Sequence, residues 1–136
     1  MARETKQVSL VWRGGLRFEG GEAGRPAMLI DGDGEQAPGP MATLLLAAGA
    51  CTGADVALIL EKMRIRLTRF EIRGAGVRRE EEPRRYVELR LTYVLAGAGL
   101  DEGKARRAID LSIEKYCSVL HSLAPDITVG YDLVLE

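Results

Sequence analysis

The stretch MATLLLAAGACTGADVALIL, residues 41–60, decides the fold, because Asp55 is its only charge and Ala and Leu dominate it. Twenty such residues are long enough to cross a lipid bilayer as a helix. Asp55, Thr52 and two glycines lie in the middle of the segment, however, and no second apolar span accompanies it. We therefore predict a helix over residues 41–64 that is buried on all sides within a soluble protein and makes no membrane contact.

Three short strands are predicted before this helix, within residues 6–31. Val8, Leu10 and Trp12 alternate with residues of the opposite face, and Gly pairs separate the short apolar segments. Glycine pairs between alternating segments are typical of hairpins, so we expect a small antiparallel meander. The stretch DGDGEQAPGP, residues 31–40, is rich in Gly and Pro and is predicted to be a loop.

Two long strands are predicted after the helix, over residues 66–78 and 86–95. The second alternates cleanly between apolar and polar positions, which indicates a strand with one buried face. Its apolar face carries Val87, Leu89, Leu91, Tyr93 and Leu95. The charged stretch RREEEPRR, residues 78–85, neutralises itself and contains a proline, so we interpret it as a solvated hairpin turn.

A second helix is predicted to begin at the N-cap Asp101 and to end before Pro125. Its apolar stripe is formed by Ala105, Ala108, Ile109, Ile113, Tyr116, Cys117 and Leu120. A last strand follows over residues 126–136. The element order β-β-β-α-β-β-α-β, with antiparallel sheets around a long buried helix, predicts a single α+β domain over residues 1–136.

Composition and charge exclude several classes of protein. The 136 residues, 14.8 kDa, carry 19 Lys and Arg against 20 Asp and Glu. This balance argues against a nucleic-acid partner, which requires an excess of positive charge on one face. With one His and no recognisable ligand spacing, we expect no metal site. The N-terminus lacks an apolar signal segment, so we expect a cytoplasmic protein whose two cysteines are thiols.

Cys51 and Cys117 each have two interpretations. A free cysteine is often simply a small buried hydrophobic residue. Alternatively, the two form a redox pair, in which one thiolate is oxidised to a sulfenic acid and the second thiol condenses with it to a disulfide. The sequence alone does not fix the distance between the sulfurs. His121 lies four residues after Cys117, so a Cys–His nucleophile of a thiol hydrolase or transferase is a further alternative to a helix-end histidine.

A nucleophilic thiol normally needs a nearby cation or a helix N-terminus. Cys51 lies about ten residues into its helix, where the helix dipole contributes little. The cation would then come from another element, and Arg13, Arg17 and Arg25 of the meander are the candidates. Asp55, four residues after Cys51, can either hydrogen-bond across a buried interface or disfavour a thiolate.

Two segments resemble known motifs. Residues 39–56, GPMATLLLAAGACTGADV, are similar to the first-cysteine helix of the OsmC/Ohr superfamily, the osmotically inducible and organic hydroperoxide resistance proteins. Residues 114–119, EKYCSV, resemble the second-cysteine motif of the same proteins. The forms of both motifs are most similar to those of the YhfA-like branch. The order of elements also matches, so the resemblance covers nearly the whole chain.

This resemblance implies an intertwined homodimer in which each long helix is buried between two sheets. It also implies a thiol-dependent peroxidase for organic hydroperoxides, with Cys51 as the peroxidatic and Cys117 as the resolving thiol. Such an enzyme would be regenerated by a small or protein-bound dithiol and would use no metal and no bound organic cofactor. The alternative is a non-catalytic dimer of the same fold that senses redox state or binds a small ligand.

The resemblance also marks positions that bear on thiolate activation. Met41 stands where well-characterised members carry a Glu, and Leu16 separates the Gly pair from the arginine, so that Arg17 is the candidate activating residue. Its carboxylate partner would then be Glu19 or Glu61.

Overall fold

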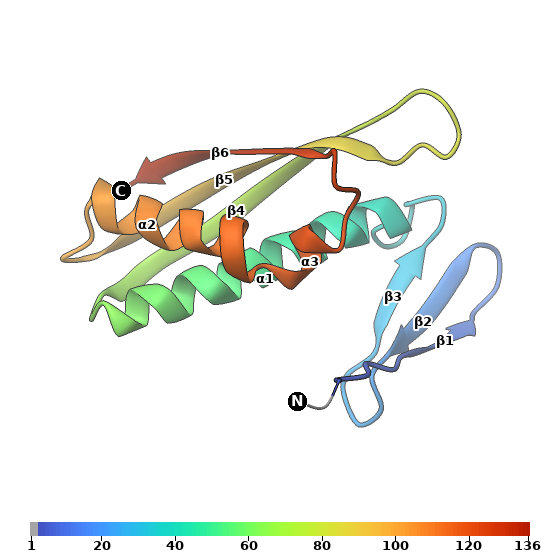
Figure 1. Ribbon diagram of the computed structural model, residues 1–136. Helices are drawn as coiled ribbons and strands as arrows, with labels where there is room; N and C mark the ends of the chain where they lie inside the picture. Colours follow the sequence, from blue (N-terminus) through green and yellow to red (C-terminus); the bar gives the residue numbers. More distant parts are fainter. Residues whose placement is uncertain (1–2) are drawn as a thin grey trace. The chain divides into compact units, whose positions relative to one another are not determined.

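A computed structural model describes residues 3–136 and divides the chain into two compact units, one ending at Leu44 and one spanning Leu45–Glu136 (Figure 1). The elements are β1 (Ser9–Trp12), β2 (Arg17–Gly21), β3 (Met28–Asp31), α1 (Pro40–Lys62), β4 (Arg66–Arg78), β5 (Tyr86–Ala98), α2 (Glu102–Leu111), the π turn η1 (Ser112–Tyr116), α3 (Ser118–His121) and β6 (Thr128–Leu135). The boundary between the units falls inside α1. That residues 1–136 act as a single domain stays a prediction.

The N-terminal unit contains the predicted antiparallel meander, with strand order β1-β2-β3. The strand β2 continues through Gly20 and Gly21, where the sequence predicted a break. Gly20 pairs with Leu10, and a Cβ atom at Gly20 would collide with the carbonyl oxygen of Ser9 and lie 2.6 Å from Cδ2 of Leu10. The glycine therefore lets two strands approach more closely than a side chain would allow.

The second unit is built on a three-stranded sheet of order β4-β5-β6. The strands β4 and β5 form the predicted antiparallel hairpin, but β6 runs parallel to β5. The prediction of antiparallel sheets is thus wrong for this pair. The helical segment between β5 and β6 returns the chain to the end at which β5 begins, so β6 enters the sheet in the same direction (Figure 1). The α+β class itself is confirmed.

One face of this sheet carries the core, and both α1 and α2 pack on that face (Figure 1). Its buried members are Val56 and Leu60 of α1, Ile65, Leu91, Tyr93 and Leu95 of the sheet region, and Ala105, Ala108 and Ile109 of α2. The opposite face carries cross-strand ion pairs, such as the pair in which Arg90 donates two hydrogen bonds to Asp132. The sheet therefore has one apolar and one charged face, as expected for a sheet covered on one side.

Helix α1 buries only one stripe of its surface. Its buried residues recur every four positions, at Ala48, Thr52, Val56 and Leu60. Only 22% of the most apolar 18-residue stretch of the helix is buried. Leu58, on another face of the helix, remains 52% exposed. The prediction of a helix buried on all sides is wrong for the single chain, because the sheet can cover only one side of a helix. The helix is long and apolar enough to cross a membrane, a property that core helices of soluble proteins share.

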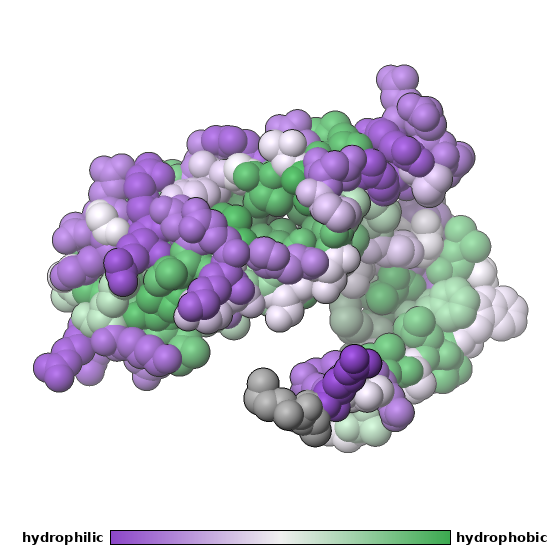
Figure 2. All heavy atoms as spheres, viewed as in Figure 1, coloured by the Kyte–Doolittle hydropathy of each residue, from purple (hydrophilic) through white to green (hydrophobic). Residues whose placement is uncertain are grey.

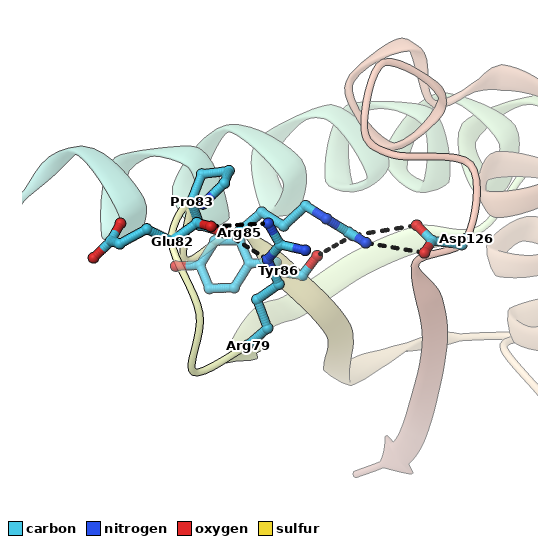
Figure 3. Close-up of polar contacts among 6 residues, drawn as sticks. All are labelled: Arg79, Glu82, Pro83, Arg85, Tyr86 and Asp126. Atoms are coloured by element: carbon cyan, nitrogen blue, oxygen red, sulfur yellow. Dashed lines mark hydrogen bonds and ion pairs between the residues drawn. The ribbon is translucent and has the colours of Figure 1, made fainter.

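The charged turn between β4 and β5 is exposed, as predicted, and its arginines hold it together (Figure 3). Nε of Arg79 donates to the carbonyl oxygen of Pro83 at 2.7 Å. The guanidinium of Arg85 donates to both carboxylate oxygens of Asp126, at 3.2 and 3.0 Å. Arg85 thereby links this turn to the segment that leads into β6.

Replacing Gly20 with Ala tests the close approach of β1 and β2. The added methyl group would collide with backbone, so Gly20→Ala is expected to lower the free energy of unfolding by about 1–3 kcal/mol, the usual cost of overpacking. Gly21→Ala is the matched control, because a Cβ there meets only ordinary contacts, 3.5 Å or more from its neighbours. Chemical denaturation of both variants measures the difference. Equal stabilities would contradict the pairing of Gly20 with Leu10.

Candidate functional site

Cys51 and Cys117 are both free thiols, and the structure brings them together. Their Sγ atoms and a carboxylate oxygen of Asp55 all lie within 4.8 Å of one another. Cys51 and Asp55 share one face of α1 because they are four residues apart. Cys51 is half-buried and Cys117 is fully buried. The two cysteines that the sequence marked therefore meet inside the second unit, with Asp55 beside them.

The position of Cys117 depends on the π turn η1. The backbone N–H of Cys117 donates to the carbonyl oxygen of Ser112 at 2.7 Å, a hydrogen bond that spans five residues instead of the four of an α-helix. The sequence predicted one continuous helix with Tyr116 on the buried stripe. That prediction is wrong, because the wider turn shifts the following side chains and leaves Tyr116 48% exposed. Such π insertions are frequent at functional sites.

A buried chain of hydrogen bonds runs beside the cysteines. The hydroxyls of Tyr93 on β5 and Thr52 on α1 are 2.8 Å apart. Oγ of Ser112 lies 3.0 Å from Oγ1 of Thr52 and 2.8 Å from Oδ2 of Asp55. The chain connects the sheet, α1 and the π turn, and it ends on the carboxylate next to both sulfurs.

The direction of these bonds follows from the number of protons available. An ionised carboxylate can only accept, so Ser112 donates its single hydroxyl proton to Asp55. The bond between Ser112 and Thr52 then uses the proton of Thr52, and Tyr93 donates to Thr52. The phenol of Tyr93 carries its proton at neutral pH, and burial raises its pKa further, from 10.0 to about 12.

Sequence reasoning missed Ser112 and Tyr93 as parts of this site. Ser112 lies three residues after Ile109, on the buried side of α2, and is itself fully buried. A hydroxyl at a core position of an amphipathic helix is a signal for a buried hydrogen bond. The alternation of β5 accounts for Tyr93 only as an apolar residue, although its hydroxyl also requires a partner when buried.

The two thiols have different environments. Burial raises the pKa of Cys117 to about 11, the amides of Leu120 and Val119 oppose this shift, and the neighbouring Cys51 side chain reinforces it. Cys117 is therefore protonated at neutral pH. Of the two sulfurs, that of Cys51 belongs to the more exposed residue.

An apolar pocket lies at the apolar cluster that contains the cysteines, although neither cysteine lines it. Its volume is about 360 Å³, and His121, Ala124 and Pro125 form part of its wall. The rest of the wall belongs to the same apolar cluster as Cys51 and Cys117, namely Ile113, Leu120, Leu123, Ile127 and Val129. The pocket and the cysteine pair thus share apolar neighbours, and the pocket wall is suited to an apolar ligand.

His121 and Arg17, two other residues that the sequence marked as site candidates, contact backbone carbonyl groups. The exposed ring of His121 has Nε2 2.9 Å from the carbonyl oxygen of Ile113, so this nitrogen contacts the backbone and not the buried thiol of Cys117. Arg17 lies on β2 of the N-terminal unit, half-buried, where its Nη2 donates to the carbonyl of Arg13 at 3.5 Å. Its role in thiolate activation stays a prediction.

Comparison with known proteins identifies the family. The sequence model of OsmC-like proteins matches residues 32–132. The chain belongs to the OsmC-like family. Protein YhfA of Escherichia coli K12 is 40% identical over 131 residues, which cover 94% of this chain and 98% of YhfA. The resemblance seen in the sequence is therefore confirmed.

Solved structures share the fold. A hypothetical protein of Aquifex aeolicus superposes with a TM-score of 0.85 and 31% identity, over 98% of this chain and 99% of its own. The organic hydroperoxide resistance protein OhrB of Bacillus subtilis superposes with a TM-score of 0.60 and 20% identity, over 98% of both chains. An OsmC-like chain with two reduced cysteines in proximity points to redox chemistry.

The raised pKa of Cys117 predicts how stability depends on pH. Below about pH 9 the thiol is protonated in both the folded and the unfolded chain, since its ordinary pKa is 9.0. Between pH 9 and about pH 11 only the folded chain keeps the proton. The free energy of unfolding therefore falls as the pH rises, by about 1.4 kcal/mol per pH unit at most.

We expect the denaturation midpoint of the reduced protein to fall more steeply between pH 9 and 10 than that of Cys117→Ala. The comparison stops at pH 10, because above that pH the raised pKa of Tyr93 also makes the free energy of unfolding fall. Equal slopes for the two proteins would show that the thiol is not held in a desolvated site.

Proposed function

We propose that this protein is a cytoplasmic thiol-dependent peroxidase that reduces organic hydroperoxides through Cys51 and Cys117 and thereby contributes to oxidative stress defence. The observation that carries the proposal is the proximity of two reduced sulfurs, one in a half-buried residue and one in a fully buried residue. Membership of the OsmC-like family supports it. OhrB of Bacillus subtilis, which shares the fold, is an organic hydroperoxide resistance protein.

The reaction has two steps in the protein. The thiolate of Cys51 attacks the terminal oxygen of the hydroperoxide, so that an S–O bond forms and the O–O bond breaks, and the alkoxide leaves as the alcohol after taking up the proton that the Cys51 thiol lost on ionising. The thiol of Cys117 then attacks the resulting sulfenic acid, forming the disulfide and releasing water. A dithiol reductant afterwards returns two electrons and two protons, which restores both thiols and leaves the reductant as a disulfide.

The assignment of the two roles follows from burial. The first thiol must meet the substrate, and Cys51 is the more exposed of the two. Cys117 is buried and protonated at neutral pH, which suits a thiol that reacts only after its neighbour has been oxidised. Its proton needs an acceptor in the second step, and the carboxylate of Asp55 lies within 4.8 Å of its sulfur. Asp55 can then pass this proton to the departing hydroxide, which leaves as water.

The substrate class follows from the surroundings of the pair. The pocket of about 360 Å³, whose wall belongs largely to the apolar cluster of the cysteines, is lined mostly by apolar side chains. Such a wall favours a hydroperoxide with an alkyl or aryl group over hydrogen peroxide, because only the former gains from burial of apolar surface. Activation of the Cys51 thiol is assigned to Arg17.

A homodimer is part of this proposal, because the single chain leaves much apolar surface uncovered (Figure 2). On α1, Leu46 and Leu58 are 56% and 52% exposed. The N-terminal unit exposes a second group, formed by Val8, Leu10, Val11, Trp12, Leu16, Phe18 and Met28. Exposed apolar patches of this kind mark interaction surfaces in soluble proteins. A second copy of the chain offers complementary surfaces of the same character.

Turnover of cumene hydroperoxide with a dithiol reductant tests the activity. Cys51→Ser should lower the rate at least 100-fold, because it removes the attacking sulfur. Cys117→Ser should still form a sulfenic acid, which dimedone traps, but should lose dithiol-driven turnover at least 10-fold. Arg17→Ala should slow the first step about 10-fold. Retained turnover in Cys51→Ser would reject the assignment, and slow stoichiometric oxidation without turnover would favour the redox-sensing alternative.

Sedimentation tests the dimer. The reduced protein is expected to sediment at twice the chain mass of 14.8 kDa. Leu58→Glu, which places a charge on the exposed face of α1, should shift the protein to the monomer while its circular dichroism stays native. Arg107→Glu, on the exposed face of α2, is the control and should remain dimeric. A folded wild-type monomer at micromolar concentration would contradict the dimer.

A further inference from the structure

The cluster of Cys51, Asp55 and Cys117 has the dimensions of a metal site. One donor atom from each residue lies within 4.8 Å of the other two. Zinc binds cysteine sulfur at about 2.3 Å and carboxylate oxygen at about 2.0–2.2 Å, so two sulfurs on one tetrahedral zinc lie roughly 3.8 Å apart. Small side-chain rotations within the observed limit would therefore bring all three donors onto one ion.

Two of the three ligands lie on one helix, an arrangement that known zinc sites also use. Cys51 and Asp55 are four residues apart on α1, a spacing that places two ligands on the same face of a helix. Cys117 is supplied from the end of the π turn, in a distant part of the sequence. The sequence predicted no metal site because this spacing matches no known motif. The fold provides the proximity that the spacing does not indicate.

The surroundings of Asp55 also suit a ligand. Ser112 donates a hydrogen bond to Oδ2 at 2.8 Å, and Ser112 is itself held by Thr52 and, through it, by Tyr93. Carboxylate ligands of metals are typically oriented by such outer hydrogen bonds. The hydrogen bond from Ser112 uses one lone pair of the Asp55 carboxylate, and the remaining lone pairs are available to a cation.

We propose that the reduced protein binds one Zn²⁺ ion through Cys51, Asp55 and Cys117, with the fourth coordination position open to water or an external ligand. Two sulfurs and one carboxylate oxygen disfavour Mg²⁺ and Ca²⁺, which prefer oxygen-only sites. The same donor set matches Zn²⁺, which binds sulfur and oxygen in tetrahedral geometry.

The zinc site and the disulfide use the same sulfurs, so the two states exclude each other. Zinc would hold the pair reduced and keep it from reacting with hydroperoxide. This consequence for regulation rests on the proposed peroxidase function. The binding of the ion does not, since it requires only the reduced cluster.

Cobalt and zinc titrations of the reduced, metal-free protein test the site. Co²⁺ is the spectroscopic probe, because bound thiolates give charge-transfer absorption whose intensity scales with their number. We expect one Co²⁺ per chain, displaced by one Zn²⁺. Cys51→Ser and Cys117→Ser should each halve the absorption. Asp55→Asn should keep it but weaken zinc binding at least 10-fold in competition with a chromogenic chelator.

Two control variants locate the ion. Glu61→Gln removes a carboxylate elsewhere on α1 and should leave the affinity unchanged. His121→Ala removes the single histidine and should also leave it unchanged. Absence of charge-transfer absorption, binding insensitive to Asp55→Asn, or binding lost in His121→Ala would each overturn the proposal. These titrations use no hydroperoxide, so they can fail while the peroxidase assay succeeds, and the reverse.

Discussion

The buried hydrogen-bonded chain from Tyr93 to Asp55 is the constraint on which the site depends. A buried hydroxyl without a partner loses about 1–3 kcal/mol of stability, so each link fixes the register of the elements it joins. The 2.8 Å bond between Thr52 and Tyr93 sets α1 against β5, and the bonds of Ser112 set the π turn against α1. The two cysteines lie on the elements that this chain aligns, which is why their sulfurs meet.

The π turn makes the two sulfurs different. Its five-residue bond, from the N–H of Cys117 to Ser112, leaves Tyr116 in solvent while Cys117 stays buried in the core. Burial also raises the pKa of Cys117, whereas Cys51 is only half-buried. A pair of this kind can react in a fixed order, or hold a metal ion between two helices. Both possibilities follow from the same three side chains.

Much of this could be predicted from the sequence. The apolar segment around Cys51, the N-cap Asp101 and the alternation in β5 place the long elements and the α+β class correctly. The π turn could not be predicted, because residues 112–116 have an ordinary helical pattern and the wider turn depends on tertiary hydrogen bonds. The parallel entry of β6 depends on where the crossover helix packs. The composition of α1 does not distinguish apolar surface buried within the chain from apolar surface that the single chain leaves exposed.

Cys51 and Cys117 are proposed to form a reactive pair within one chain. Mixing the reduced protein with one equivalent of cumene hydroperoxide, counting free thiols over seconds and mapping the product by mass spectrometry tests it directly. We expect rapid loss of both thiols and an intramolecular disulfide between Cys51 and Cys117. Thiols that persist for hours, or a disulfide formed only between chains, would contradict it.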